Sequence, residues 1–312
     1  MSRYPASGAL TLPTLLGDYP KTRALRDGRV TSPLVTLDIA DITSAQKGFK
    51  PLVRDLAFDV AEVAIVTFLQ ARAVGKPYVL LPIVINGNFH HGSLIVRSDA
   101  GIDTARDLEH RRIGMRMYSQ TTPTWVRGFL ENDYGVDLST VKWVTFEDPH
   151  VRECVDPAGT ERADGSRQLI DMLLDGEVDA AMMGQGVPDD PRIKRLFPDS
   201  VAAAAEWRAA NGGAVPINHM MCVREELAAE RPDAVSEIFR MLLAARAAME
   251  PPMPDAQRDL QPVGLARLEG ALERAIRYAH QQGLIGRRFT VEELFAPSTR
   301  DLGQEEETAT CQ

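Results

Sequence analysis

Histidine is the side chain best suited to move protons near neutral pH, and three of the chain's six histidines lie in two short polar segments. His90 and His91 are adjacent in the glycine-containing segment Asn86–Ser93, and His219 follows Pro216 just before an apolar run. Neighbouring side chains on an extended backbone point to opposite faces, so at most one of the adjacent pair can reach a given site. The same adjacency disfavours a joint metal site. These histidines are therefore candidates for acid–base chemistry, with hydrogen-bonded residues of connecting segments as the alternative.

A run of hydroxyl side chains at positions 118–125 precedes a predicted helix. Thr122 is a good N-cap and Pro123 suits the first helical position, so we expect the helix to begin there. The free N–H groups at such a helix end attract anions, which favours a carboxylate-binding site; an ordinary capped helix is the alternative. The candidate ligands of the carboxylate are Arg116, Ser119, Thr121, Thr122 and His90.

Five further residues are considered one at a time. Trp125 could stack on an aromatic ligand or lie in the core, and Arg127, two positions later, faces elsewhere and is expected in a structural ion pair. Arg54 is a candidate for a second carboxylate contact. Glu62 could act in catalysis, or cap or pair within the first lobe. His150 could contribute to the site or be a solvated loop residue.

Composition and motifs exclude several classes of function. The three cysteines are widely spaced without a C-x-x-C motif, which disfavours disulfide frameworks and cysteine zinc sites, and we expect no metal. The net charge of -9 argues against nonspecific nucleic-acid binding. No P-loop, H-E-x-x-H, G-x-S-x-G or G-x-G-x-x-G motif occurs. No apolar run is long enough for a membrane helix and no signal peptide is visible, so we expect a cytoplasmic protein with no membrane partner.

Short strand-like apolar runs alternate with longer helical ones, which is typical of an α/β protein built from parallel βαβ units. The run Tyr78–Ile85 contains Pro82, so we expect it to be a broken strand or an edge strand. Polar segments at 86–93 and 213–220 are expected to connect two lobes. The first lobe would comprise residues 1–88 and 220–312, with a disordered tail at 304–312, and the second residues 89–219. A small ligand would bind in the cleft between the lobes.

Several motifs occur in a fixed order over residues 10–295. They are Tyr19-Pro-Lys-Thr-Arg-Ala-Leu-Arg-Asp-Gly-Arg-Val, Phe58-Asp-Val-Ala-Glu62, Trp125-Val-Arg127-Gly128, Tyr134-Gly135-Val136, Gly176-Glu-Val-Asp-Ala180, Arg195-Leu-Phe-Pro198 and Pro216-Ile-Asn-His219. This order resembles the 4,5-dihydroxyphthalate decarboxylase family.

The resemblance implies a two-lobed fold of the type 2 periplasmic-binding-protein kind, with two connections between the lobes. It also implies decarboxylation of 4,5-dihydroxyphthalate to protocatechuate without an organic cofactor, and it favours His91 over His90 as a catalytic residue, together with His219. The chain departs from the family at residues 87–92, where members commonly have Arg-x-Phe-Arg-His-Ser and this sequence has Gly-Asn-Phe-His-His-Gly.

The sequence therefore leads to the hypothesis of a cofactor-independent aromatic acid decarboxylase that acts on a small aromatic carboxylate and forms a homo-oligomer. Proton transfer would involve His91 and His219, with His150 and Glu62 as further candidates. The alternative is a non-catalytic cytoplasmic binding or sensing protein that closes around a small organic anion.

Overall fold

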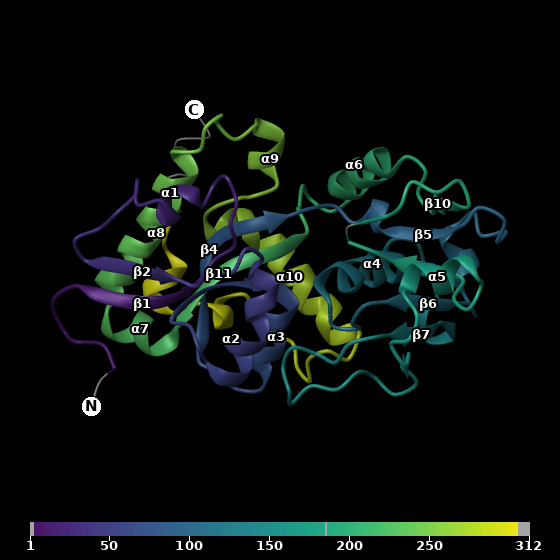
Figure 1. Cartoon of the computed structure of the whole chain (residues 1–312), viewed down its shortest axis with the longest axis horizontal. Coiled ribbons are helices and arrows are strands. Elements are labelled where there is room, and N and C mark those ends of the chain that lie inside the picture. The colour runs from purple at the N-terminus through teal and green to yellow at the C-terminus, as the bar shows by residue number, and fades with distance from the viewer. Residues whose placement is uncertain (1–2, 185, 305–312) are drawn as a thin grey trace. The chain divides into compact units, whose positions relative to one another are not determined.

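The computed structural model of the chain describes residues 3–184 and 186–304. The chain divides into two compact units. Unit 1 comprises the residues up to Gly87, Ile217–Glu273 and the residues from Phe289 onward, and unit 2 comprises Asn88–Pro216 and Arg274–Arg288. Figure 1 shows the elements of each unit in their chain order.

Unit 1 contains a five-stranded sheet in the order β2-β1-β3-β11-β4. Its strands are β1 (Leu10–Leu15), β2 (Val35–Ile39), β3 (Val60–Ala64), β4 (Tyr78–Gly87) and β11 (Ile217–Arg224). Its helices are α1 (Arg23–Arg26), α2 (Phe49–Asp55), α3 (Ile65–Ala73), α7 (Glu225–Glu230), α8 (Pro232–Ala247), α9 (Asp255–Asp259), α11 (Pro297–Arg300) and the first part of α10 (Leu265–Gln281).

Alternation along the strands of unit 1 explains how its core forms. Val79, Leu81 and Ile83 of β4 share one face of the sheet and pack in a buried cluster with Ile238 and Leu242 of α8. The helices α2 and α3 pack against β3, whose five residues are all buried. Apolar residues are expected throughout a strand that is fully buried. The carboxylate in β3 is an exception, and its burial requires hydrogen-bond donors close to it.

Unit 2 contains a six-stranded sheet in the order β10-β5-β9-β6-β7-β8. Its strands are β5 (Leu94–Arg97), β6 (Arg112–Met115), β7 (Lys142–Thr145), β8 (Glu161–Arg162), β9 (Ala180–Met182) and β10 (Ile193–Arg195). Its helices are α4 (Thr121–Asn132), α5 (Leu169–Leu174), α6 (Ser200–Ala210) and the end of α10.

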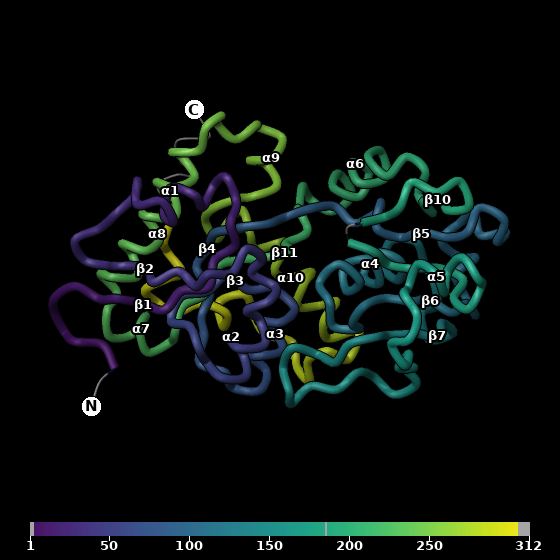
Figure 2. Tube along the Cα trace, viewed as in Figure 1, coloured from purple at the N-terminus to yellow at the C-terminus, as the bar shows by residue number. Residues whose placement is uncertain are grey.

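The α/β fold class predicted from the sequence is confirmed, but the expected parallel sheets are in fact mixed. β11 runs antiparallel to both β3 and β4, and β5 runs antiparallel to β9 and β10. β5 is the first strand after the chain passes into unit 2, and β11 is the strand with which the chain returns to unit 1. Neither strand is part of a βαβ repeat. Figure 2 shows β4 and β11 side by side in unit 1. β4 is an edge strand, as Pro82 predicted, but it is continuous over ten residues.

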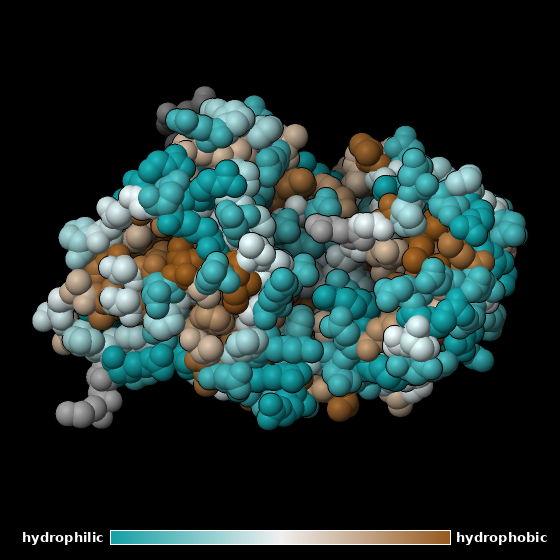
Figure 3. All heavy atoms as spheres, viewed as in Figure 1, coloured by the Kyte–Doolittle hydropathy of each residue, from teal (hydrophilic) through white to brown (hydrophobic). Residues whose placement is uncertain are grey.

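The C-terminal region corrects the expected boundaries, since residues 220–312 were all assigned to the first lobe. Arg274–Arg288 belongs to unit 2 because Tyr278 packs edge-on against Trp125 of α4, and Gln282 accepts a hydrogen bond from Arg127. The predicted tail at 304–312 lies outside the described residues from 305 onward. The face of the molecule in Figure 3 is mostly hydrophilic, in keeping with the 25% content of charged residues.

Candidate functional site

A glutamate and a histidine lie on neighbouring antiparallel strands of unit 1. Glu62 of β3 is opposite Met221 of β11, and His219 is two residues before Met221. Residues that are two apart on one strand share a face, so Glu62 and His219 are diagonal neighbours on the same face of the sheet. The Nδ1 atom of His219 lies 2.6 Å from Oε1 of Glu62. Glu62 is fully buried and His219 is 6% exposed.

Two further donors complete the environment of the Glu62 carboxylate. The backbone N–H of Gly17 donates to Oε2 at 2.9 Å, and the hydroxyl of Tyr19 donates to Oε1 at 2.9 Å. Both residues follow β1, which places the β1–α1 loop beside β3. A β-carbon at position 17 would lie 2.5 Å from the Tyr19 ring, so this close approach requires glycine.

These contacts determine the charge of Glu62. Burial favours the neutral acid, but the hydrogen bond and charge of His219, the Gly17 N–H and the Tyr19 hydroxyl together lower the pKa of Glu62 below its usual value. The carboxylate is therefore ionised and can only accept hydrogen bonds. Burial, followed by the charge of Glu62 and the hydrogen bond to it, raises the pKa of Tyr19, which keeps the phenol protonated as a donor.

An ionised Glu62 fixes the orientation and tautomer of His219. Because the carboxylate only accepts, Nδ1 of His219 carries the proton that is shared with Glu62. In the neutral ring the lone pair is then on Nε2. Phe49 packs edge-on against the imidazole, with ring centroids 5.3 Å apart. The arrangement holds an imidazole of defined tautomer, which is what a general base requires.

A buried lysine lies close to this group. The ammonium of Lys21 donates to the carbonyl of Ile85 and, at 2.9 Å, to Oε1 of Gln261, and it lies 5.2 Å from the centroid of the Tyr19 ring. Burial, and secondly the charge of Arg246, lower the pKa of Lys21 to about 8, against the opposite effect of Glu62. Lys21 therefore places a positive charge near the tyrosine side of the carboxylate.

The structure places His91 in a different environment, within unit 2. Its ring stacks on Phe129 at 4.4 Å and 5°, and Tyr134 and Phe197 contact it edge-on. Neither ring nitrogen has a hydrogen-bond partner among the described residues. Burial lowers the pKa of His91 to about 4, with Asp133 opposing. The sequence proposed that His91 shares the proton transfers, but this apolar environment favours a neutral side chain that packs in an aromatic cluster.

The hydroxyl-rich segment of unit 2 leads into the buried N-terminal end of α4. The helix begins at Thr121 with Gln120 as N-cap, two residues earlier than expected, so Thr122 is not the cap. Ser119, Thr121 and Thr122 are all at most 6% exposed. In the part of the chain that the structure describes, Oγ1 of Thr121 is buried without a hydrogen-bond partner. Arg116 precedes this segment, with Nε 3.9 Å from Oε1 of Glu147 and an exposed side-chain fraction of 40%.

Two residues of α4 lie in the core. Trp125 is 2% exposed and packs edge-on against Trp207 and Tyr278, so of the two functions considered for it the structure favours packing. Arg127 was expected in an ion pair. Its fully buried guanidinium instead lies 3.8 Å from the Tyr118 ring centroid and donates to the carbonyl of Tyr118 and to Gln282. A planar guanidinium can satisfy its donors with carbonyls and an aromatic face in this way.

Comparison with known proteins places the chain in a family. It is 30% identical over 324 aligned positions to a 4,5-dihydroxyphthalate decarboxylase of Comamonas testosteroni, covering 93% of this chain and 97% of the relative. A 4,5-dihydroxyphthalate decarboxylase of Pseudomonas putida is 32% identical over 221 positions, covering 66% of this chain and 85% of the relative. The chain belongs to the 4,5-dihydroxyphthalate decarboxylase family. This membership confirms the resemblance found in the sequence and indicates a carboxy-lyase.

The chain also matches a family of binding proteins, and solved structures share its fold. Residues 41–274 match, and thereby belong to, the family described as ABC transporter, phosphonate, periplasmic substrate-binding protein. The alkanesulfonate-binding protein SsuA from Xanthomonas axonopodis pv. citri, bound to MOPS, superposes with a TM-score of 0.54 at 14% identity, covering 93% of this chain and 99% of that chain. The periplasmic aliphatic sulphonate binding protein SsuA from Escherichia coli gives 0.53 at 10% identity, covering 96% and 95%. These likenesses confirm the predicted periplasmic-binding-protein-like fold.

Of the residues predicted from the sequence, the structure brings Glu62 and His219 together. Arg54 lies in α2 of unit 1, whereas His90 and His150 are buried residues of unit 2. No group of three His, Cys, Asp or Glu side chains within residues 3–184 and 186–304 is arranged to hold a metal ion. Over the same residues no helix is long and apolar enough to cross a membrane.

Sequence reasoning did not name three groups that lie around this pair, which are the Gly17 N–H, Tyr19 and Lys21. A signal was present, because the segment Gly17-Asp-Tyr-Pro20 follows the strand-like apolar run of residues 10–16, and α/β proteins often place functional residues after the end of a strand. The partner of that segment, Glu62, is 43 residues from Tyr19 in the chain, and no local pattern links the two.

Proposed function

We propose that this protein catalyses the cofactor-independent decarboxylation of a hydroxylated, phthalate-type aromatic acid, such as 4,5-dihydroxyphthalate, to give protocatechuate. The observation that carries the proposal is the buried Glu62–His219 pair, in a chain whose relatives are named 4,5-dihydroxyphthalate decarboxylase. An oriented imidazole against an ionised carboxylate is suited to proton transfer. A protein that only binds its ligand does not need this capability.

The reaction is accessible to side chains alone for an electronic reason. Direct loss of CO2 would leave an aryl carbanion with no electron sink. Removal of the proton from the hydroxyl para to the carboxylate lets the oxygen push electrons into the ring, so that the carbon bearing the carboxylate takes up a proton. The C–C bond then breaks, CO2 leaves, and its bonding electrons restore the aromatic ring. The net change is the replacement of one carboxylate by one proton.

Within this scheme we assign His219 to a proton transfer through Nε2, because Nδ1 is engaged with Glu62. Glu62 stabilises the imidazolium that forms and remains ionised itself. Of the other candidates, His90 and His150 stay available for the second transfer, whereas the environment of His91 disfavours a charged form.

We further propose that the start of α4 binds a substrate carboxylate, with Arg116, Ser119, Thr121 and Thr122 as its ligands. The buried, unpartnered Oγ1 of Thr121 and the N–H groups of the first turn support this assignment. Arg116→Leu should weaken the binding of dicarboxylates far more than that of neutral catechols. Equal losses for both ligands would contradict the assignment.

The reaction is tested by incubating the protein with 4,5-dihydroxyphthalate and measuring released CO2 and protocatechuate. His219→Asn should depress turnover by about 10²–10⁴-fold, the usual contribution of general acid–base catalysis, with a smaller effect on substrate affinity. His280→Asn, at an exposed position of α10, is the matched control and should turn over like the wild type.

A second candidate function is binding of a small organic anion without turnover. The match of residues 41–274 to a family of substrate-binding proteins favours it. Tight binding of hydroxylated phthalates with no release of CO2 would support this function over the first.

A further inference from the structure

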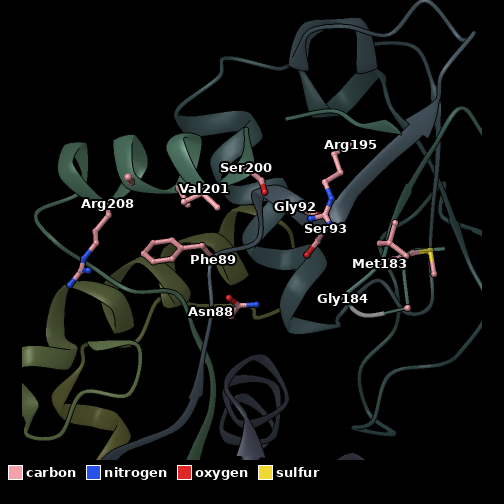
Figure 4. Close-up of a pocket in the computed structure, with 14 residues that line it drawn as sticks. Asn88, Phe89, Gly92, Ser93, Met183, Gly184, Arg195, Ser200, Val201 and Arg208 are labelled. Atoms are coloured by element: carbon pink, nitrogen blue, oxygen red, sulfur yellow. The ribbon is translucent and has the colours of Figure 1, made fainter. Parts of the chain in front are cut away.

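A pocket of about 650 Å³ lies entirely within unit 2. Fourteen residues line it, and Figure 4 shows them around the opening. They come from the segment after β4, the segment after β9, the end of β10 and one face of α6: Asn88, Phe89, Gly92, Ser93, Met183, Gly184, Gly186, Val187, Arg195, Ser200, Val201, Ala204, Ala205 and Arg208. None of the residues assigned above to catalysis or carboxylate binding is among them.

The contribution of α6 follows from its sequence. Ser200, Ala204 and Arg208 are spaced four residues apart, so they form a stripe along one face of the helix. Alanine at the middle position leaves the space that a larger side chain would fill. Asp199 caps the helix by accepting from the N–H of Ala202, so its carboxylate is engaged. The same face therefore offers a hydroxyl at one end, a hollow in the middle and a guanidinium at the other end.

The charge of the lining contrasts with that of the whole protein. Arg195 and Arg208 are its two charged residues, and the lining contains no acidic residue, although the chain carries a net charge of -9. Each guanidinium is held by one carbonyl: Nη1 of Arg195 donates to Gly92 at 3.2 Å, and Nε of Arg208 donates to Gly213 at 3.3 Å. A guanidinium has five N–H donors, so both retain donors for a ligand.

The apolar part of the lining suggests what the rest of the ligand looks like. Phe89 is partly exposed and braced edge-on by Trp207, with ring centroids 6.2 Å apart. Val201 is 79% exposed, so its apolar surface is accessible to a ligand. The space-filling view shows a hydrophobic side chain standing on the surface over α6 (Figure 3). A ligand with an apolar body would cover these groups.

From these observations we infer that the pocket of unit 2 binds a small organic anion, with its acidic group at Arg195 and Arg208 and an aromatic or branched body against Phe89 and Val201. The volume lies within the range of about 300–1,000 Å³ typical of small-molecule sites. Carboxylate, sulfonate and phosphonate groups share the geometry that guanidinium recognises. This inference rests on residues of unit 2 to which the proposed decarboxylation assigns no function, although the pocket adjoins the proposed carboxylate site, since a β-carbon on Gly184 would lie 3.3 Å from Oγ1 of Thr122.

Isothermal titration calorimetry of the full-length protein tests the inference with five probes: benzoate, benzenesulfonate, phenylphosphonate, neutral benzamide and acetate. The expected result is binding of at least one of the three aromatic anions. Benzamide, which lacks the acidic group, and acetate, which lacks the aromatic body, should bind at least 10-fold more weakly. The relative affinities of the three anions identify the acidic group. Equal binding of benzamide, or no binding of any aromatic anion at millimolar concentration, would overturn the inference.

Variants locate the binding event. Arg208→Gln should weaken the preferred anion about 10- to 100-fold, the range expected for loss of a charge-assisted hydrogen bond, and Arg208→Lys should restore part of it. Ala205→Leu keeps both arginines but puts a larger side chain at another position of the lining, so it should weaken binding as well. Arg192→Gln is the control, because Arg192 is exposed, pairs with Asp190 and does not line the pocket.

The same titrations separate this inference from the proposed function. His219→Asn should bind the preferred anion like the wild type, whether or not the wild type releases CO2 from a hydroxylated phthalate. Unchanged affinity in both Arg208→Gln and Ala205→Leu, in variants that melt like the wild type, would show that the anion binds elsewhere and would refute the pocket as its site.

Discussion

Replacing Glu62 by glutamine tests whether the carboxylate orients His219. The change keeps the size of the side chain but turns one acceptor oxygen into a donor NH2 group. In the wild type, Oε2 accepts from Gly17, and Oε1 accepts from Tyr19 and His219. The Gly17 N–H cannot change its role. If the amide oxygen faces it, the NH2 group faces Tyr19 and His219, and the imidazole must present an unprotonated Nδ1, which moves its proton to Nε2.

The geometry sets the expected magnitudes. If the NH2 group instead faces Gly17, one buried N–H loses its acceptor, which costs about 1–3 kcal/mol of stability. In either orientation the negative charge that stabilises the imidazolium is gone, so turnover should fall by about 10²–10⁴-fold. Because folding lowers the pKa of Glu62, the ionised carboxylate contributes stability above the pKa of the unfolded chain, and this contribution is lost as the pH falls through the lowered pKa. The stability difference between wild type and variant should therefore shrink in acid.

The assay combines steady-state release of CO2 with urea unfolding at neutral and acid pH. Glu225→Gln is the control, because Glu225 is an exposed carboxylate of unit 1 that pairs with Arg72 at 3.1 Å. An exposed pair of this kind contributes about 1 kcal/mol or less, and its loss should leave turnover unchanged. A Glu62→Gln variant that keeps more than half of the wild-type turnover would refute the orienting role.

Three further outcomes are expected. Tyr19→Phe removes one hydrogen bond to an ionised acceptor and leaves two, so unfolding should become easier by about 1.5–3 kcal/mol, and turnover should fall less than in Glu62→Gln; a larger fall would mean that the phenol itself takes part in the chemistry. For His91 the folded pKa of about 4 is below the unfolded value of about 6.5, so the unfolded chain binds more protons between them and stability falls by up to about 3 kcal/mol as the pH drops from 6.5 to 4. His91→Phe should lose less stability over that interval in thermal melts, and a loss equal to that of the wild type would contradict the lowered pKa. Gly128→Ala should destabilise by about 1–3 kcal/mol in urea unfolding, because a β-carbon there would overlap the ring of Tyr278; unchanged stability would show that the ring can move aside.

The elements of the fold could be predicted where the apolar pattern was strong. The alternation of short strand-like apolar runs with longer helical ones predicted the α/β class, and the chain order of motifs identified the family. The antiparallel course of β11 could not be predicted. The direction of a strand depends on the neighbouring strands with which it pairs, and the period-2 pattern of its side chains is the same in either direction. For the same reason the assignment of Arg274–Arg288 to unit 2 depends on long-range packing against α4.

The candidate site was partly predictable, for a related reason. Histidine and glutamate drew attention by type, so His219 and Glu62 were both named, but their pairing arises only from the register of β3 and β11. His91 has the same chemistry as His219 and a different environment. Its neighbours Phe129 and Phe197 come from positions far along the chain, and they remove water and hydrogen-bond partners from its ring.

The comparison of these two histidines shows how one fold can serve either binding or catalysis. A buried imidazole without a partner is driven to its neutral form by desolvation, and it then serves packing. A buried imidazole beside an ionised carboxylate can carry a proton at low cost, provided the carboxylate is itself kept ionised. In unit 1 the Gly17 N–H and the Tyr19 hydroxyl supply that condition from the β1–α1 loop, while β3 supplies the glutamate and β11 the histidine. The proposed proton-transfer pair thus depends on two strands and one loop of unit 1.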